Sequence, residues 1–142
     1  MKKLTLIAAT ILLCLTACAR EEPIALANLP NQAQSLINTY FADLPVALTK
    51  VDHEGLQKIY KVIFTTGGSI EFNHNGEWTE IEISTGVPMA LIPEAIVDYL
   101  KANYPTQIVV KIDRDIYDYE LQLDNGVELT FNKKYQLIDI EY

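Results

Sequence analysis

The sequence predicts an α+β fold, in which two tandem helix-plus-antiparallel-sheet repeats form one continuous antiparallel sheet with the helices packed on one face. Three observations predict it: an internal duplication, two short amphipathic helices, and strand-like alternation of apolar and polar residues after each helix. At 142 residues the chain has room for one compact domain, or for two small units that share a core.

The duplication is the strongest of these signals. Four pairs of segments align in the same order, and their offset falls from 63 to 61 and then to 59 residues. Small losses of this kind belong in loops, so the alignment is structurally coherent. The aligned segments are 29–41 with 92–104, 50–52 with 111–113, 60–73 with 119–132, and 78–83 with 137–142. We assign repeat 1 to residues 29–83, a linker to 84–91 and repeat 2 to 92–142.

Each repeat begins with a predicted helix. Pro30 and Pro93 stand where a helix tolerates proline, in its first turn. Apolar residues then recur at the spacing that gives a helix one apolar face, and we expect these side chains to pack in the core. They are Ala33, Leu36, Ile37, Tyr40 and Phe41 in repeat 1, and Ile96, Tyr99, Leu100 and Tyr104 in repeat 2.

Four strands are predicted after each helix, because apolar and polar residues alternate with the period of a sheet that has one buried and one solvent-facing side. Glycine turns such as Asn75-Gly76 and Asn125-Gly126 join antiparallel neighbours. The buried side is predicted to carry Tyr60, Val62, Phe64, Ile70, Phe72, Thr79, Ile81, Ile83, Tyr119, Leu121, Leu123, Leu129, Phe131, Ile138 and Ile140. The same alternation places Ile63, Trp78 and Leu137 on the solvent-facing side, unless the turn before Trp78 rotates that side chain into the core.

The first 17 residues are predicted to be a lipoprotein signal peptide. Lys2 and Lys3 precede an apolar run that is too short to span a bilayer comfortably, and the run ends in LTAC at 15–18. This ending resembles a lipobox, in which a peptidase cuts before a diacylated cysteine, so Cys18 would carry the lipid and residues 18–28 would form a tether. The alternative is an ordinary secretory signal in which Cys18 has no special role.

Cleavage would leave 125 residues with 9 basic and 19 acidic side chains, a net charge of −10. This acidity argues against nucleic acid as a partner and against adhesion to an anionic membrane by charge alone. It suits a basic protein or peptide partner, and acidity by itself also keeps a protein soluble. The expected location is the cell envelope, either on the periplasmic side of the outer membrane or on the cell surface. The sequence leaves the oligomeric state open.

No group of residues in the chain has the pattern of a catalytic site. His53 and His74 are both predicted in loops, and no cysteine is available to pair with either. Asp113, Asp115 and Asp118 lack the glycine turn and distal glutamate of a calcium loop. We therefore expect a protein that is not an enzyme, with no cofactor and no dedicated metal site.

The solvent-facing side of the predicted sheet is strongly acidic, and this is the candidate binding site. Its predicted partner-binding residues are Trp78, Glu71, Glu80, Glu82, Glu120 and Asp139, and further acids on the same side are Asp118, Glu128 and Glu141. Such a surface can steer a basic partner while one aromatic side chain supplies a central contact. The alternative is that these positions are polar only because they face solvent and discourage aggregation.

The segments KVD, Y-x-V, G-x-I-E-F-N and G-E-W-x-E-I of repeat 1 resemble the PepSY-like family of secreted bacterial proteins, and the resemblance covers residues 29–142. That family is similar in fold to the beta-lactamase-inhibitory protein, which implies a concave sheet and a role in binding or inhibition. Repeat 2 departs from the pattern, since Tyr135-Gln136-Leu137 replaces Gly76-Glu77-Trp78.

These observations predict a lipid-anchored cell-envelope binding module. Its partner would be a protein or peptide, with inhibition as one form such binding can take. The alternative is an envelope protein that binds a cation or small ligand through the same carboxylates.

Overall fold

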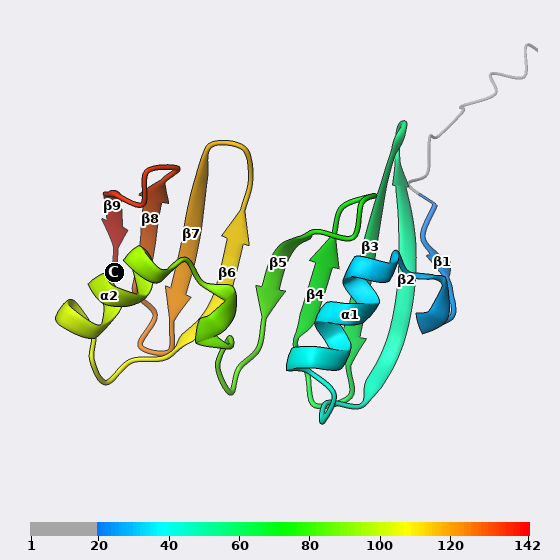
Figure 1. Ribbon diagram of the computed structural model, residues 1–142, viewed down its shortest axis with the longest axis horizontal. Helices are drawn as coiled ribbons and strands as arrows, with labels where there is room; N and C mark the ends of the chain where they lie inside the picture. Colours follow the sequence, from blue (N-terminus) through cyan, green and yellow to red (C-terminus); the bar gives the residue numbers. More distant parts are fainter. Residues whose placement is uncertain (1–19) are drawn as a thin grey trace, which may run out of the picture.

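The structure is a computed structural model and describes residues 20–142, which form one antiparallel sheet of nine strands in chain order. Both helices lie on the same face of the sheet, each over the strands of its own half (Figure 1). The helices are α1 (Asn31–Tyr40) and α2 (Glu94–Asn103), with short 3-10 turns at Leu26–Asn28 and Met89–Leu91. The strands are β1 (Glu22–Pro23), β2 (Val46–Glu54), β3 (Gln57–Phe64), β4 (Ser69–Phe72), β5 (Trp78–Glu82), β6 (Val109–Arg114), β7 (Asp118–Leu123), β8 (Glu128–Asn132) and β9 (Leu137–Glu141).

The predicted α+β architecture is confirmed. Helix α1 with β2–β5 and helix α2 with β6–β9 are two copies of one unit, and β5 pairs with β6 to make the sheet continuous. The predicted signal peptide 1–17 and Cys18 lie outside the described residues. Within residues 20–142, neither helix is long and apolar enough to cross a membrane.

The start of the described chain belongs to the sheet. Residues Glu22 and Pro23 form β1, which pairs antiparallel with Val51 and Lys50 of β2. The predicted tether 18–28 therefore joins the fold after only a few residues. His53, predicted in a loop, lies instead in β2, because β2 and β3 continue into a long hairpin that turns at 55–56.

The core lies between the two helices and the face of the sheet that they cover, which we call the inner face. Ala33 of α1 and Ile96 of α2 are fully buried, as are Ile81 and Ile112, which face each other across the β5–β6 pair. Burial of each of these isoleucine side chains contributes about 1.5–3 kcal/mol. Tyr40, expected in the core, is instead 41% exposed at the end of α1.

A β-bulge recurs at the same place in both repeats and changes which side chains face inward. In repeat 1, Glu71 pairs with Glu80 but Phe72 pairs with Trp78, so Thr79 is an extra residue. The extra residue shifts the alternation by one position. The prediction that Trp78 faces solvent is therefore wrong: its side chain is only 5% exposed and belongs to the core.

Repeat 2 has the corresponding bulge, because Thr130 pairs with Asp139 while Phe131 pairs with Leu137. Leu137, predicted to face solvent, packs against the core, and Ile138, predicted to be buried, is 58% exposed. The turns before the two bulges are also alike. Asn73 Oδ1 accepts hydrogen bonds from two backbone N–H groups of its turn, and Asn132 Oδ1 does the same.

Candidate functional site

The face of the sheet opposite the helices, which we call the outer face, carries the acids predicted for the binding site. Glu71 and Glu80 are register partners on β4 and β5, and Glu82 lies two residues further along β5. Glu120 on β7 pairs with Thr130, which in turn pairs with Asp139 on β9. The sheet thus brings all five predicted carboxylates to one surface.

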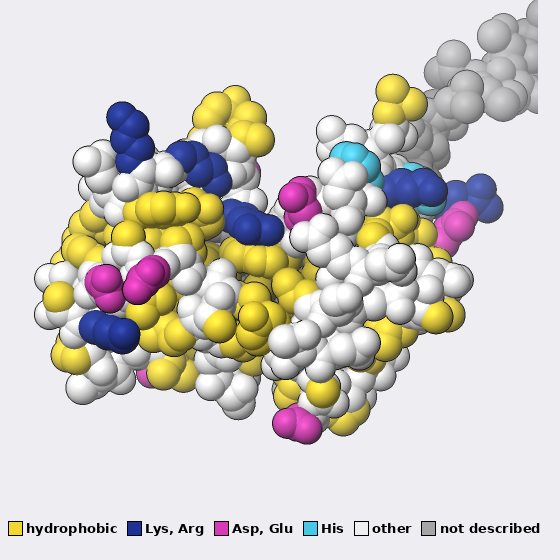
Figure 2. Space-filling view, viewed as in Figure 1, with side chains coloured by type: hydrophobic (Ala, Val, Ile, Leu, Met, Phe, Trp, Pro, Cys, Tyr) yellow, Lys and Arg dark blue, Asp and Glu magenta, His cyan; other side chains and the backbone are white. Residues whose placement is uncertain are grey.

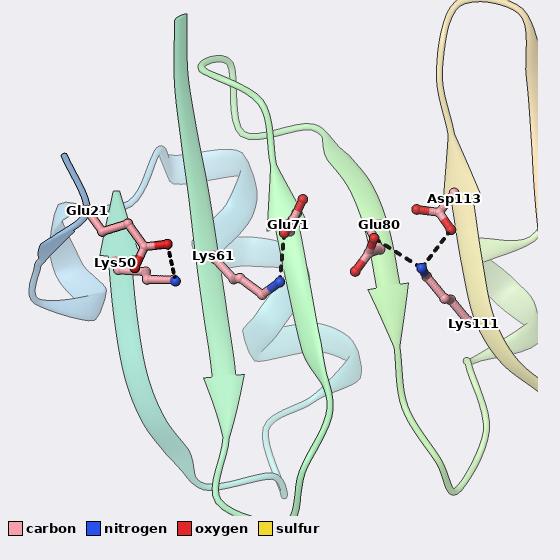
Figure 3. Close-up of polar contacts among 7 residues, drawn as sticks. All are labelled: Glu21, Lys50, Lys61, Glu71, Glu80, Lys111 and Asp113. Atoms are coloured by element: carbon pink, nitrogen blue, oxygen red, sulfur yellow. Dashed lines mark hydrogen bonds and ion pairs between the residues drawn. The ribbon is translucent and has the colours of Figure 1, made fainter. Parts of the chain in front are cut away.

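Lysines neutralise part of this surface in repeat 1. Lys61 Nζ donates to Glu71 Oε1 at 2.7 Å, and Lys50 Nζ donates to Glu21 Oε1 at 2.7 Å (Figure 3). The first pair joins β3 and β4, and the second joins β2 to the residue before β1. Glu71 is therefore already compensated within the fold, which leaves it little free charge for a partner.

The junction between the repeats holds a crowded carboxyl pair. Glu80 and Asp113 face each other across the β5–β6 pair, and Lys111 Nζ lies 3.4 Å from Glu80 Oε2 and 3.3 Å from Asp113 Oδ2 (Figure 3). Burial, together with the hydrogen bond and negative charge of Glu80, raises the pKa of Asp113 to about 6. Burial lowers the pKa of Lys111, but Asp113 and Glu80 outweigh it and hold that pKa above its ordinary value.

Four carboxylates on the outer face of repeat 2 have no ion-pair partner among the described residues, although Lys111 lines a hollow beside them. Among residues 20–142, no lysine or arginine forms an ion pair with any of four acids on β7–β9, which we call the carboxylate patch: Glu120, Glu128, Asp139 and Glu141. All four are exposed. The surface beside them is hollowed, with a volume of about 240 Å³, and its polar lining includes Gln122 and Thr130.

Trp78 lies on the other side of the sheet and cannot anchor a partner on the outer face. The Arg114 guanidinium stacks over its ring, with 3.8 Å from the carbon to the ring centroid, and Arg114 Nε donates to the Trp78 carbonyl at 2.7 Å. Burial lowers the pKa of Arg114. The pair lines a groove of about 580 Å³ between the β2–β3 and β6–β7 hairpins, whose walls include Tyr119 and Lys133.

Asp113, Lys111 and Arg114 are the site residues that the sequence analysis did not select. The repeated KVD and KID segments could have indicated the first two, because each segment places a lysine and an aspartate on one side of a strand. Among residues 20–142, no group of three or more His, Cys, Asp and Glu side chains has the arrangement of a metal site.

The fold and sequence match known proteins. A family model described as "putative beta-lactamase-inhibitor-like, PepSY-like" matches residues 58–139. No curated protein sequence matches the chain. Among solved structures, a protein from Bacteroides thetaiotaomicron described as a "putative calcium-regulated periplasmic protein" has a TM-score of 0.83 and 44% identity, and the match covers 86% of this chain and 97% of that one.

Two proteins from Bacteroides vulgatus are similarly close. A "putative periplasmic protein" of the DUF2874 family has a TM-score of 0.84 and 41% identity, covering 86% of this chain and 97% of that one. A "putative periplasmic protein of unknown function" has a TM-score of 0.81 and 33% identity, covering 87% and 100%. These descriptions support an envelope location for the chain, and none of them indicates a family of enzymes.

Proposed function

Because the chain belongs to the PepSY-like family of beta-lactamase-inhibitor-like proteins, we propose that it is a lipid-anchored binding protein of the cell envelope rather than an enzyme. It holds a basic segment of a protein or peptide partner on the outer face of repeat 2. Cys18 carries the lipid, and the carboxylate patch of Glu120, Glu128, Asp139 and Glu141 supplies the contact surface.

The observation that carries this proposal is the contrast in charge compensation along the outer face. In repeat 1 a lysine faces an acid across the strands, as Lys61 faces Glu71. The patch in repeat 2 forms no ion pair within residues 20–142, because Lys111, which lines the same hollow, is paired with Glu80 and Asp113 instead. The four carboxylates of the patch repel one another, and a lysine or arginine of a partner would reduce that repulsion. Each exposed charge pair contributes about 0.2–1 kcal/mol to binding. Several pairs together would give selective, salt-dependent binding.

Asp113 adjoins the patch and makes the proposed site sensitive to pH. Its carboxyl shares the hollow with Glu120 and Glu128, and its pKa of about 6 means that it loses a proton near neutral pH. The negative charge of the site therefore rises as the pH rises through 6. Binding of a basic segment should strengthen over the same interval.

A peptide titration tests the proposal. The lipidated protein is titrated into a fluorescently labelled peptide of alternating lysine and serine, and anisotropy gives the affinity. Replacing three patch acids (Glu120→Gln, Glu128→Gln and Glu141→Gln) should weaken binding at least about tenfold, or roughly 1.4 kcal/mol. The matched control changes three exposed acids elsewhere, Asp43→Asn, Glu94→Gln and Asp98→Asn, and shifts the net charge equally. Equal weakening by both triple variants would contradict the proposed site, because net charge alone would then explain it.

The second candidate function is binding of a cation by the same carboxylates. It is favoured by the relative from Bacteroides thetaiotaomicron that is described as calcium-regulated, with 44% identity to this chain. Calorimetric titration with calcium separates the two functions. A saturable heat signal that the patch triple variant loses would favour the cation, whereas no signal would favour the basic segment.

A further inference from the structure

Four turns of the sheet meet at one edge of the molecule, at the top of Figure 1, which we call the upper edge. Because the sheet is antiparallel in chain order, alternate turns fall at the same end. The upper-edge turns are 55–56, 73–77, 115–117 and 133–136, and the two hairpin turns at the opposite edge are 65–68 and 124–127.

The two tallest upper-edge hairpins end in exposed apolar side chains. Leu56 at the β2–β3 tip is fully exposed, and Ile116 and Tyr117 at the β6–β7 tip are 78% and 72% exposed. Figure 2 shows both apolar tips rising above the rest of the surface. The opposite-edge turns 65–68 and 124–127 carry no exposed large apolar side chain. Hairpin turns are usually formed by glycine and polar residues, which are also well solvated. Neither turn formation nor solvation therefore explains the apolar residues at these two tips.

The upper edge is also less acidic than the rest of residues 20–142 taken together. The four turns with one flanking residue on each side contain three basic and four acidic residues, and the rest of 20–142 contains six basic and fifteen acidic. Per residue, an anionic surface would therefore repel this edge less than it repels the rest of 20–142 taken together. The basic residues here are Arg114, Lys133 and Lys134, and none of them forms an ion pair with a described residue.

Strand β1 directs the N-terminal end of the described chain toward this same edge. Glu22 pairs with Val51 and Pro23 with Lys50, so the residues before Glu22 run in the direction of Glu54 and the β2–β3 tip. Cys18 precedes Glu22 by four residues, which reach at most about 14 Å when fully extended. A lipid on Cys18 would hold the upper edge close to the membrane.

We propose that the upper edge rests on the membrane that holds the lipid anchor, with Leu56 and the Ile116–Tyr117 pair in the lipid headgroup region. This inference depends on the proposed lipidation of Cys18. Apolar and aromatic side chains are favoured at such an interface, and basic side chains beside them contact lipid phosphates. The sheet then stands upright on its hairpin tips, and the outer face remains open to a partner.

Site-specific labelling tests the placement. Lipidated Cys18 is blocked, so Leu56→Cys and Tyr117→Cys can each carry one environment-sensitive dye, with Thr66→Cys at the opposite edge as the control. The lipidated variants are reconstituted in vesicles of about three parts phosphatidylethanolamine to one part phosphatidylglycerol. We expect emission at 56 and 117 to shift to shorter wavelength, and iodide quenching to fall at least about threefold relative to position 66.

Each outcome separates the two proposals. Intact mass without an acyl group on Cys18 would overturn the anchor and the membrane contact with it. An acylated protein whose probes at 56 and 117 are quenched as strongly as the probe at 66 would overturn the membrane contact and leave the anchor standing. Probes that are protected only after envelope proteins are added would show a protein interface and would also overturn it.

Discussion

The two repeats have the same fold, but their outer faces differ in charge at equivalent positions. Lys61 and Glu71 form an ion pair across β3 and β4, and the register-equivalent residues Glu120 and Thr130 face each other across β7 and β8. Glu71 of repeat 1 is therefore paired within its own repeat, whereas Glu120 of repeat 2 forms no ion pair with a described residue. The duplication has therefore kept the core positions in both units, while the outer surfaces of the two units have diverged in charge.

The turns before the bulges show a second difference between the repeats. Gly76 in repeat 1 has a φ of 84°, and its repeat 2 counterpart Tyr135 adopts a φ of 61° despite its side chain. A Cβ at Gly76 would lie 2.7 Å from Cβ of Pro30, at the start of α1. The repeat 1 turn is thus packed against its helix, while Tyr135 is partly exposed. The two turns have the same geometry, but Gly76 packs against the core in repeat 1 and Tyr135 faces solvent in repeat 2.

The largest expected effect concerns the residues after these turns. Trp78→Ala should lower the free energy of unfolding by about 3–5 kcal/mol, because it removes a large buried side chain. The equivalent change Leu137→Ala, on an edge strand, should lower it by only about 1–2 kcal/mol. Urea unfolding followed by circular dichroism measures both. Similar losses for the two variants would show that the repeats pack equally well at this position.

Gly76→Ala should lower the free energy of unfolding by about 2–3 kcal/mol, since the new methyl group meets Pro30 and the positive φ disfavours a side chain. The matched change Gly126→Ala, at a φ of 87° with no neighbouring atom within 4 Å, should cost about 1 kcal/mol. Thermal or urea unfolding of the two variants gives the difference. A Gly76 variant as stable as the Gly126 variant would mean that α1 can move away from the turn.

The raised pKa of Asp113 predicts that stability falls as the pH rises through about 6. The folded state holds this proton more tightly than the unfolded chain, so the contribution is complete below the ordinary carboxyl pKa of 3.8 and is lost above 6. Allowing for solvent screening of a half-buried group, the difference is about 1–2 kcal/mol.

The variant Asp113→Asn should therefore be more stable than the natural protein at about pH 8, with the advantage disappearing at about pH 4. Urea unfolding at the two pH values measures the change. The control variant is Asp52→Asn, at the equivalent position of repeat 1. It should keep the pH dependence of stability that Asp113 gives the natural protein. An unchanged pH dependence in the Asp113 variant would refute the assignment.

The smallest expected effect transfers the repeat 1 ion pair to repeat 2. Glu120→Lys with Thr130→Glu should weaken the lysine–serine peptide about tenfold, because the patch then carries its own counter-charge. Anisotropy titration measures it. The reciprocal change, Lys61→Glu with Glu71→Thr, should strengthen binding by extending the patch into repeat 1. If neither change alters affinity, the peptide binds elsewhere.

The sequence allowed much of the fold to be predicted, because the duplication and the two alternation periods are local signals. The helices around Ile37 and Ile96 and the buried strand residues Ile81 and Leu129 follow from those periods alone. The bulges could not be predicted in this way. An inserted residue such as Thr79 leaves no mark in the alternation that distinguishes it from an ordinary strand residue.

The candidate site was predictable only in part, for a related reason. Parity along a strand places Glu71 and Glu120 on one face, but compensation of a charge depends on which residue lies opposite in the next strand. That register decides that Lys61 meets Glu71 and that Asp113 meets Glu80. The position of Trp78 behind the sheet likewise follows from the bulge and was missed.

Because of the register of the last two strands, the electrostatic interaction between the two ends of repeat 2 depends on the salt concentration. Glu128 and Glu141 are opposite each other and lie five residues along their strands from the β8–β9 turn, a separation of roughly 17 Å. The Debye length at physiological ionic strength is about 8 Å, so Glu128 and Glu141 are screened from Lys133 there. In dilute buffer the screening length exceeds the separation, and the two ends would no longer behave as independent charges.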